Sequence, residues 1–124
     1  MENVIFKYTR EDALDDGYAL DVSNLAHLAG FGPAVAVSVT RAGIWHGIIA
    51  APLEGGQPVS EETESMRIAK VLNAVGRAIH AELKKNPGEY LFTDIEACGH
   101  KIWAGLEATE DGKPAVNIFT PSEY

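Results

Sequence analysis

The sequence predicts an α+β fold, in which a small antiparallel sheet packs on one long helix and short helices lie near the N-terminus. Two observations support this class: one long segment with helical periodicity, and a C-terminal third in which apolar and polar residues alternate. A third is the first third of the chain, which contains several short segments bounded by capping residues and glycines. The chain has 124 residues. We therefore expect a single domain over residues 1–124 that buries one hydrophobic core without the help of disulfides or metal ions.

The long helix is predicted over residues 61–85. Ser60 is placed to cap it, glutamates follow in its first turn, and Lys84 and Lys85 lie at its negative end. Asn86-Pro87-Gly88 ends the periodic segment. Its apolar side chains recur every three or four residues and form one stripe: Ile68, Leu72, Val75, Ile79 and Leu83.

The C-terminal third predicts a three-stranded antiparallel meander. Alternation indicates strands over residues 90–96, 101–108 and 115–120. A tight turn over residues 97–100 joins the first pair, and the Asp111-Gly112 dipeptide is typical of the hairpin that joins the second.

The N-terminal part predicts short elements that complete or cover this sheet. We expect a strand over residues 4–8, then a short helix capped by Thr9 and ended at Gly17. An extended piece over residues 18–22 leads to a second helix, capped by Ser23 and closed by Gly30. A buried strand over 34–39, a helix from 41 to 51 weakened by two glycines, and a loop over 52–60 follow.

Period-two alternation sorts the meander into two faces. One is aliphatic and suits the stripe of the long helix: Leu91, Ile95, Ile102, Ala104, Leu106, Val116 and Ile118. The other mixes aromatic, charged and amide side chains: Tyr90, Phe92, Asp94, Glu96, Lys101, Trp103, Glu107, Asn117 and Phe119. Either N-terminal elements cover this second face, or it is a partly open platform whose aromatics Tyr90, Phe92, Trp103 and Phe119 contact a partner.

Four carboxylates form a second candidate surface. Glu11, Asp12, Asp15 and Asp16 are spaced to lie on one side of the first short helix. Such a side is a solvated face, a contact for a basic partner, or a calcium or magnesium site, although the usual calcium-loop spacing is absent.

Composition limits the class of partner. The chain has 10 basic and 18 acidic residues, a net charge of −8, which argues against direct nucleic-acid binding because that needs a basic surface. One cysteine, Cys98, allows no internal disulfide and fits a reducing cytoplasm. No apolar run approaches membrane-spanning length, and the N-terminus does not resemble a signal peptide, so no membrane association is expected.

The sequence favours a protein that is not an enzyme and uses no cofactor. It contains no His-Glu-x-x-His motif, no glycine-rich phosphate loop and no Gly-x-Ser-x-Gly elbow. The nearest approach to a ligand set is Asp94, Glu96, Cys98 and His100, which would support a small metal-binding protein or enzyme instead. A third alternative is a structural homodimer joined through the aromatic face or the long helix.

The opening of the chain resembles a family of small uncharacterised proteins of phages, plasmids and related mobile elements. The resemblance covers about the first 45 residues and departs within residues 33–40, and these residues carry it: Tyr8-Thr9-Arg10, Ala13, Asp16-Gly17, Leu20-Asp21-Val22, Ala29-Gly30-Phe31, Pro33 to Thr40, and Trp45. It implies a mobile-element origin and a bacterial host cytoplasm, and it implies no activity. From the net charge of −8, the lack of a catalytic motif and the aromatic face, we expect a small interaction protein that binds a host or element protein and modulates host defence or replication.

Overall fold

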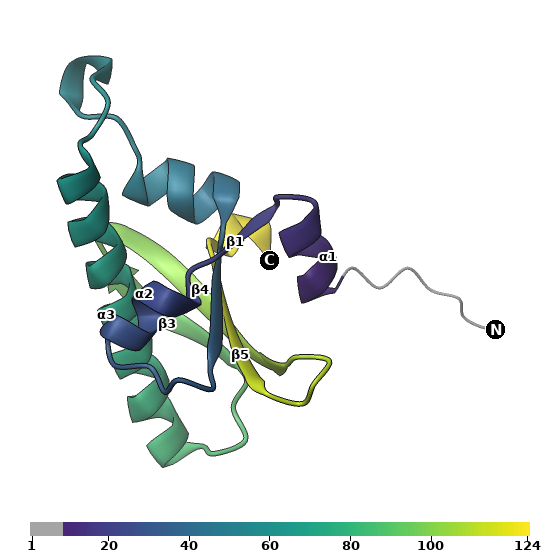
Figure 1. Ribbon diagram of the computed structural model, residues 1–124. Coiled ribbons are helices and arrows are strands. Elements are labelled where there is room, and N and C mark those ends of the chain that lie inside the picture. Colours follow the sequence, from purple (N-terminus) through teal and green to yellow (C-terminus); the bar gives the residue numbers. More distant parts are fainter. Residues whose placement is uncertain (1–8) are drawn as a thin grey trace.

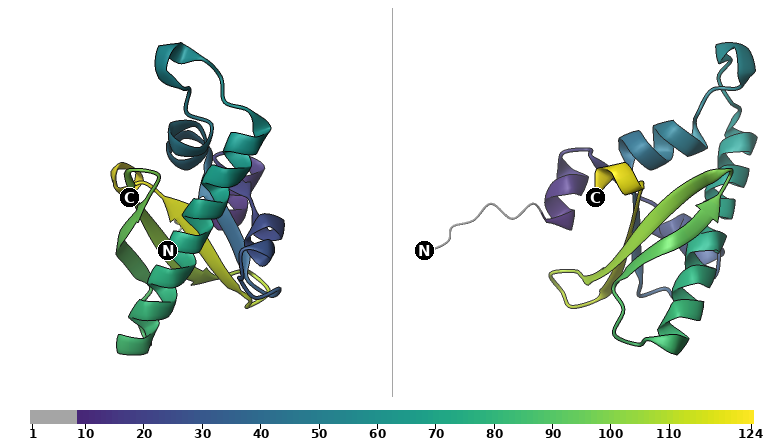
Figure 2. Two further views of the ribbon diagram at one scale, coloured as in Figure 1. Left: turned by 90° about the vertical axis from the view of Figure 1, so that its left-hand side faces the viewer. Right: turned by 180° about the vertical axis from the view of Figure 1, so that it is seen from behind.

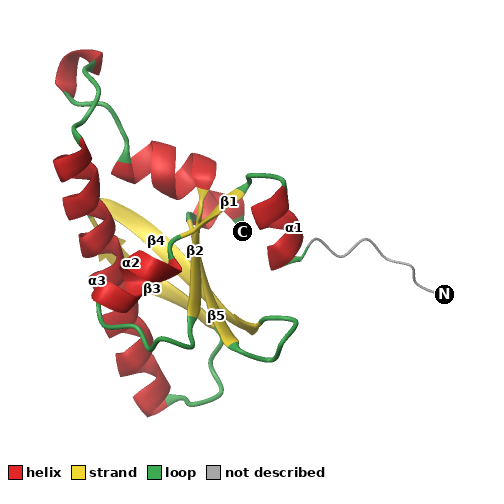
Figure 3. Cartoon of the chain, viewed as in Figure 1, coloured by secondary structure: helices red, strands yellow, loops and turns green. Residues whose placement is uncertain are grey.

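The computed structural model describes residues 9–124, and the strand predicted over residues 4–8 lies outside them. The described chain forms four longer helical segments, five strands and two short 3₁₀ turns (Figures 1 and 3). In chain order they are α1 (Arg10–Asp15), β1 (Ala19–Asp21), α2 (Ser23–Leu28), β2 (Ala36–Thr40), η1 (Arg41–Ile49), η2 (Glu54–Gly56), α3 (Glu61–Lys85), β3 (Leu91–Ala97), β4 (His100–Ala108), β5 (Pro114–Phe119) and η3 (Pro121–Glu123).

The strands form one sheet in the order β1-β2-β5-β4-β3. The predicted antiparallel meander of β3, β4 and β5 is present, and β1 pairs antiparallel with β2. β2 pairs parallel with β5, with Val37 opposite Val116 and Val39 opposite Ile118. The α+β class is therefore confirmed, while the sheet is mixed rather than wholly antiparallel.

The two faces of the sheet are covered unequally. α3 crosses one face, and α2 and η1 pack on the same side (Figures 1 and 2). The predicted aliphatic layer lies there: Ile102, Ala104, Val116 and Ile118 are almost completely buried, together with Leu72 of α3. The opposite side, in the part of the chain that the structure describes, carries α1 and the C-terminal turn η3 (Figure 1).

A bulge in β3 changes which side chains face the helix. Phe92 pairs with Ala104 and Ile95 with Ile102, so three steps on β3 match two on β4. Phe92 and Ile95 therefore both lie on the face that α3 covers, and both are buried. The prediction that Phe92 belongs to the aromatic face is wrong, because strict alternation does not hold across a bulge. Leu91, predicted for the aliphatic face, pairs with Gly105 and is half-buried.

The local signals of the first third are mostly confirmed. Thr9 caps α1 in a reciprocal box with Asp12, with 3.1 Å between Asp12 N and Thr9 Oγ1. Gly17 and Gly30 follow the two short helices with φ of 75° and 103°. Ser23 is not a cap but the first residue of α2.

The hydroxyl of Ser23 has a different role from the predicted cap. It accepts a bond from Val37 N of β2 at 2.9 Å and donates to the Asp21 carboxylate at 2.6 Å. Partial burial by itself would raise the pKa of Asp21, but the hydrogen bonds from the Ser23 side chain and backbone, with the nearby Arg10 charge, hold that pKa below its ordinary value.

η1 confirms the predicted helix at residues 41–51, but it is wider than an α-helix. Ala50 N donates to Trp45 O, five residues back. The carbonyls at its C-terminal end are satisfied by α3: Nη1 of Arg67 donates to Ile48 O, Ile49 O and Ala51 O at 3.2, 3.0 and 2.9 Å. One guanidinium thus caps η1 and joins it to α3.

Cys98 and Gly99 form the two-residue turn between β3 and β4. Both have positive φ, 54° for Cys98 and 78° for Gly99, which is the geometry of a type I′ hairpin turn. Left-handed backbone costs an ordinary residue about 1 kcal/mol or more, so Cys98 is strained there.

Of the helices in residues 9–124, none has both the length and the apolarity that crossing a membrane requires.

We predict that Arg67→Met lowers the free energy of unfolding by about 2 kcal/mol, because three carbonyls lose a charged donor. Urea unfolding followed by circular dichroism measures this loss. Arg77→Met is the matched control, since Arg77 is exposed on the same helix, and it should change stability by less than about 0.5 kcal/mol. Equal losses in the two variants would contradict the capping role.

We predict that Cys98→Asn raises the free energy of unfolding by about 0.5–1 kcal/mol, because asparagine adopts positive φ more readily than cysteine. Cys98→Ser, which has no such backbone preference, should stay close to wild type. The thermal midpoints of the three proteins under reducing conditions test the turn geometry. A midpoint for Cys98→Asn at or below that of Cys98→Ser would contradict it.

Candidate functional site

Three aromatic rings gather on the less covered face of the sheet. Trp103 and Phe119 are paired residues of β4 and β5, and their ring centroids are 6.5 Å apart at 70°. Tyr124 lies 5.3 Å from Trp103 and stacks on Phe119 at 5.9 Å. Trp103 and Phe119 are half-buried, whereas Tyr124 is 74% exposed. We call these three residues the aromatic cluster.

The C-terminal turn η3 places Tyr124 over the sheet. Thr120 begins this turn in a capping box with Glu123, whose Oε1 accepts from Thr120 N at 2.9 Å. The same carboxylate oxygen accepts from Thr40 Oγ1 at 2.8 Å, and Thr40 Oγ1 in turn caps η1 by accepting from Ile44 N at 3.1 Å. Gly43 leaves room for the carboxylate, because a Cβ at that position would overlap it. η3 is therefore fastened to the N-terminal end of η1.

A polar network beside the aromatic cluster anchors α1 to the sheet. Asn117 Oδ1 accepts from Arg10 Nε at 3.2 Å and from Ser38 Oγ at 2.9 Å. Asn117 Nδ2 donates to the Glu107 carboxylate. Ser38 is only 2% exposed, so the network reaches the interior of the sheet. Among residues 9–124, Nη2 of Arg10 is buried without a hydrogen-bond partner, a departure from the usual pairing of buried polar atoms.

A pocket of about 350 Å³ lies between α1 and the C-terminal turn. Arg10 and Ala13 of α1 line one side, and Phe119 and Tyr124 line the other. The acidic helix and the aromatic face, predicted as two separate surfaces, are therefore neighbours. Among residues 9–124, the N-terminal elements cover this face only in part. This arrangement is intermediate between the two alternatives that the sequence leaves open, a covered face and an open platform.

The four carboxylates of the acidic segment do not form one uniform surface. Asp12, Asp15 and Asp16 are exposed, and Asp12 also accepts from Thr9 N in the helix cap. Glu11 is half-buried and lines a second hollow of about 360 Å³ together with Glu107 and Glu110. The rim of the open face next to α1 is therefore acidic.

Two of the four aromatic residues predicted for a partner site lie in the aromatic cluster. Trp103 and Phe119 are in it, while Phe92 is buried on the opposite face beneath α3. Tyr90 is 68% exposed and lies just before β3, where its carbonyl accepts from Leu106 N at 2.8 Å. Sequence reasoning missed Tyr124, although the Thr-x-x-Glu pattern at Thr120 and Glu123 could have indicated the turn that brings it there.

The alternative metal site is not assembled in the structure. Within residues 9–124, no three side chains among His, Cys, Asp and Glu approach one another closely enough to hold a metal ion. Asp94 lies in the bulged part of β3, whereas Cys98 and His100 belong to the hairpin at the end of that strand. The same finding applies to the acidic segment of α1.

Comparison of the chain with protein-family models, with curated proteins and with solved structures finds no match.

We predict that Gly43 and Glu123 are energetically coupled. Gly43→Ala should lower the free energy of unfolding by about 1 kcal/mol, although alanine favours a helix, because the methyl group displaces the Glu123 carboxylate and breaks its bonds. In a Glu123→Ala background the same change should be neutral or stabilising. A double-mutant cycle from urea unfolding measures the coupling; additive effects would contradict the contact.

Proposed function

We propose that this chain is a small non-enzymatic interaction protein that binds a protein partner through the open face of its sheet. The observation that carries the proposal is the aromatic cluster of Trp103, Phe119 and Tyr124, which remains accessible beside a pocket. Clustered aromatic side chains are enriched among the residues that dominate binding energy at protein interfaces. An aromatic side chain that served only to fill the core would lie on the α3 side of the sheet, as the buried Phe92 does.

The surroundings of the aromatic cluster favour a partner with a basic contact face. Glu11, Glu107 and Glu110 surround one hollow of this face, and Asp15 is exposed on the neighbouring helix. With a net charge of −8, the long-range field also attracts a basic protein and repels nucleic acid. Direct nucleic-acid binding and membrane association are therefore not part of the proposal.

The biological setting of the proposal rests on the family resemblance of the first 45 residues or so. We propose a mobile-element origin and the cytoplasm of a bacterial host, with a host or element protein as the partner. Modulation of host defence or replication is the kind of role that such a contact would serve.

We predict that Tyr124→Ala and Trp103→Ala weaken partner binding by about thirtyfold or more, the loss expected for interface hot spots. The tagged protein is used to capture partners from host lysate, and the affinity of the captured protein is then measured for each variant. Tyr90→Ala is the matched control, because Tyr90 is also an exposed tyrosine but lies outside the aromatic cluster. Asp15→Lys should weaken the binding of a basic partner and should not strengthen the binding of any other captured protein.

Two outcomes would overturn the proposal. One is that Tyr124→Ala and Tyr90→Ala retain the same partner with equal affinity. The other is that the wild-type chain captures only itself and sediments as a concentration-dependent dimer that Trp103→Ala dissociates, which would favour the homodimer.

A further inference from the structure

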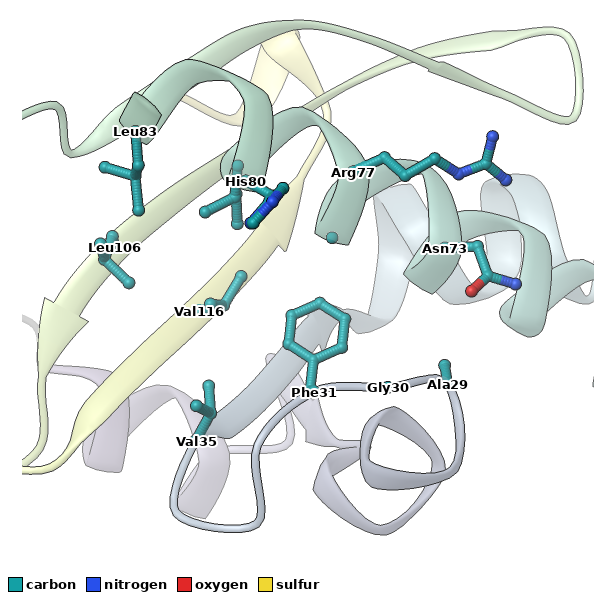
Figure 4. Close-up of a pocket in the computed structure, with 12 residues that line it drawn as sticks. Ala29, Gly30, Phe31, Val35, Asn73, Arg77, His80, Leu83, Leu106 and Val116 are labelled. Carbon is teal, nitrogen blue, oxygen red and sulfur yellow. The ribbon is translucent and has the colours of Figure 1, made fainter. Parts of the chain in front are cut away.

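A cleft of about 560 Å³ opens on the other face of the sheet, away from the aromatic cluster. It lies between the C-terminal half of α3 and the segment that connects α2 to β2 (Figure 4). Phe31 and Val35 form one wall, Ile79 and Leu83 the other, and Leu106 and Val116 line the sheet side. Its volume is in the range of small-molecule sites.

The position of Phe31 shows how the cleft is built. Gly30 ends α2 with a φ of 103°, and Phe31 N donates to Ala26 O at 3.0 Å. The ring then packs against Gly76 of α3, where an added Cβ would lie 3.4 Å from the ring. The missing side chain at Gly76 admits the ring, so the wall of the cleft that the connecting segment forms is anchored on α3.

The inner surface of the cleft is apolar and incompletely covered. Phe31, Val35, Ile79, Leu83 and Leu106 all pack against the buried core and yet are only half-buried. The aliphatic layer of the fold therefore reaches the surface here. An apolar ligand chain that enters the cleft gains about 0.8 kcal/mol for each methylene it buries.

The polar residues of the cleft come from one element, and two of them, Asn73 and Arg77, lie toward one end, whereas His80 lies nearer Leu83 (Figure 4). Asn73, Arg77 and His80 are exposed residues of α3 that line the cleft. Figure 4 shows Asn73 and Arg77 on one side of Phe31, and Leu83 and Leu106 on the other. Residues 73 and 83 are ten positions apart on the helix, which corresponds to about 15 Å. Lys70 and Arg77 also line the adjoining hollow together with Glu96, so cations outnumber carboxylates at this end in a protein that is acidic overall.

We infer that the cleft binds a linear aliphatic carboxylate. Its chain would lie along α3 between Phe31 and Leu106, and its carboxylate would accept hydrogen bonds from Arg77 and Asn73. A cleft about 15 Å long that is mainly apolar toward Leu83 and has Arg77 near its other end suits an anionic head on an apolar chain better than a neutral or cationic one. This site is distinct from the open face and does not depend on the proposed protein partner.

Decanoate, 1-decanol and decyltrimethylammonium are the probes, used below their aggregation limits with the full chain. Isothermal titration should show saturable one-to-one binding of decanoate, about tenfold tighter than that of the alcohol. Octanoate should bind more weakly, by about fourfold for each methylene removed. Amide NMR shifts on adding decanoate should be largest around Phe31 and Arg77.

Variants separate the head from the chain. Arg77→Gln should weaken decanoate about tenfold and leave 1-decanol unchanged. Lys84→Gln, the matched loss of a cation on the same helix outside the cleft, should change neither. Val35→Trp should fill the cleft and abolish binding of both probes; if this variant does not fold, the Arg77→Gln comparison decides.

Several results would overturn the inference. These are equal affinity for decanoate and 1-decanol, unsaturable binding, and equal effects of Arg77→Gln and Lys84→Gln. A second copy of the chain in the cleft would also overturn the inference. Sedimentation would then show a concentration-dependent dimer that decanoate leaves intact, and decanoate would cause no NMR shift at Phe31.

Discussion

Parallel pairing of β2 with β5 is the constraint on which the rest of the structure depends. Two parallel strands cannot be joined by a tight hairpin, so the chain leaves β2 and reaches β3, which runs in the same direction, through η1 and α3. This crossover lies on one face of the sheet and supplies the helical layer that packs on the buried side chains of the strands there. In the part of the chain that the structure describes, the other face is left to α1 and η3, which are too short to cover it.

The two faces are therefore stabilised by different kinds of interaction. On the α3 side, burial of aliphatic side chains dominates, as shown by the complete burial of Leu72 and Ile118. On the open side, specific hydrogen bonds position short elements: Arg10 to Asn117 for α1, and Glu123 to Thr40 for η3. Short elements held by polar bonds leave aromatic rings accessible, which explains why the candidate partner site lies there.

Much of the fold follows from local sequence signals. The predicted bounds of the long helix, residues 61–85, are those observed, and the strands of the meander agree within one or two residues. Local periodicity and turn chemistry determine these elements. The parallel pairing of β2 depends on contacts with residues about 80 positions away, which no local pattern encodes.

The candidate site was harder to predict from the sequence than the fold, because it too depends on contacts between residues that are far apart in the chain. Phe92 was assigned to the wrong face because one extra residue in β3 reverses the alternation. Tyr124 and Arg10 were missed as neighbours of Phe119 because their positions depend on η3 and on Asn117. The capping of η1 by Arg67 also predicts how the molecule opens: η1 cannot separate while α3 stays folded without stranding three carbonyls. The backbone amide protons of η1 and α3 should therefore exchange with solvent as one cooperative unit.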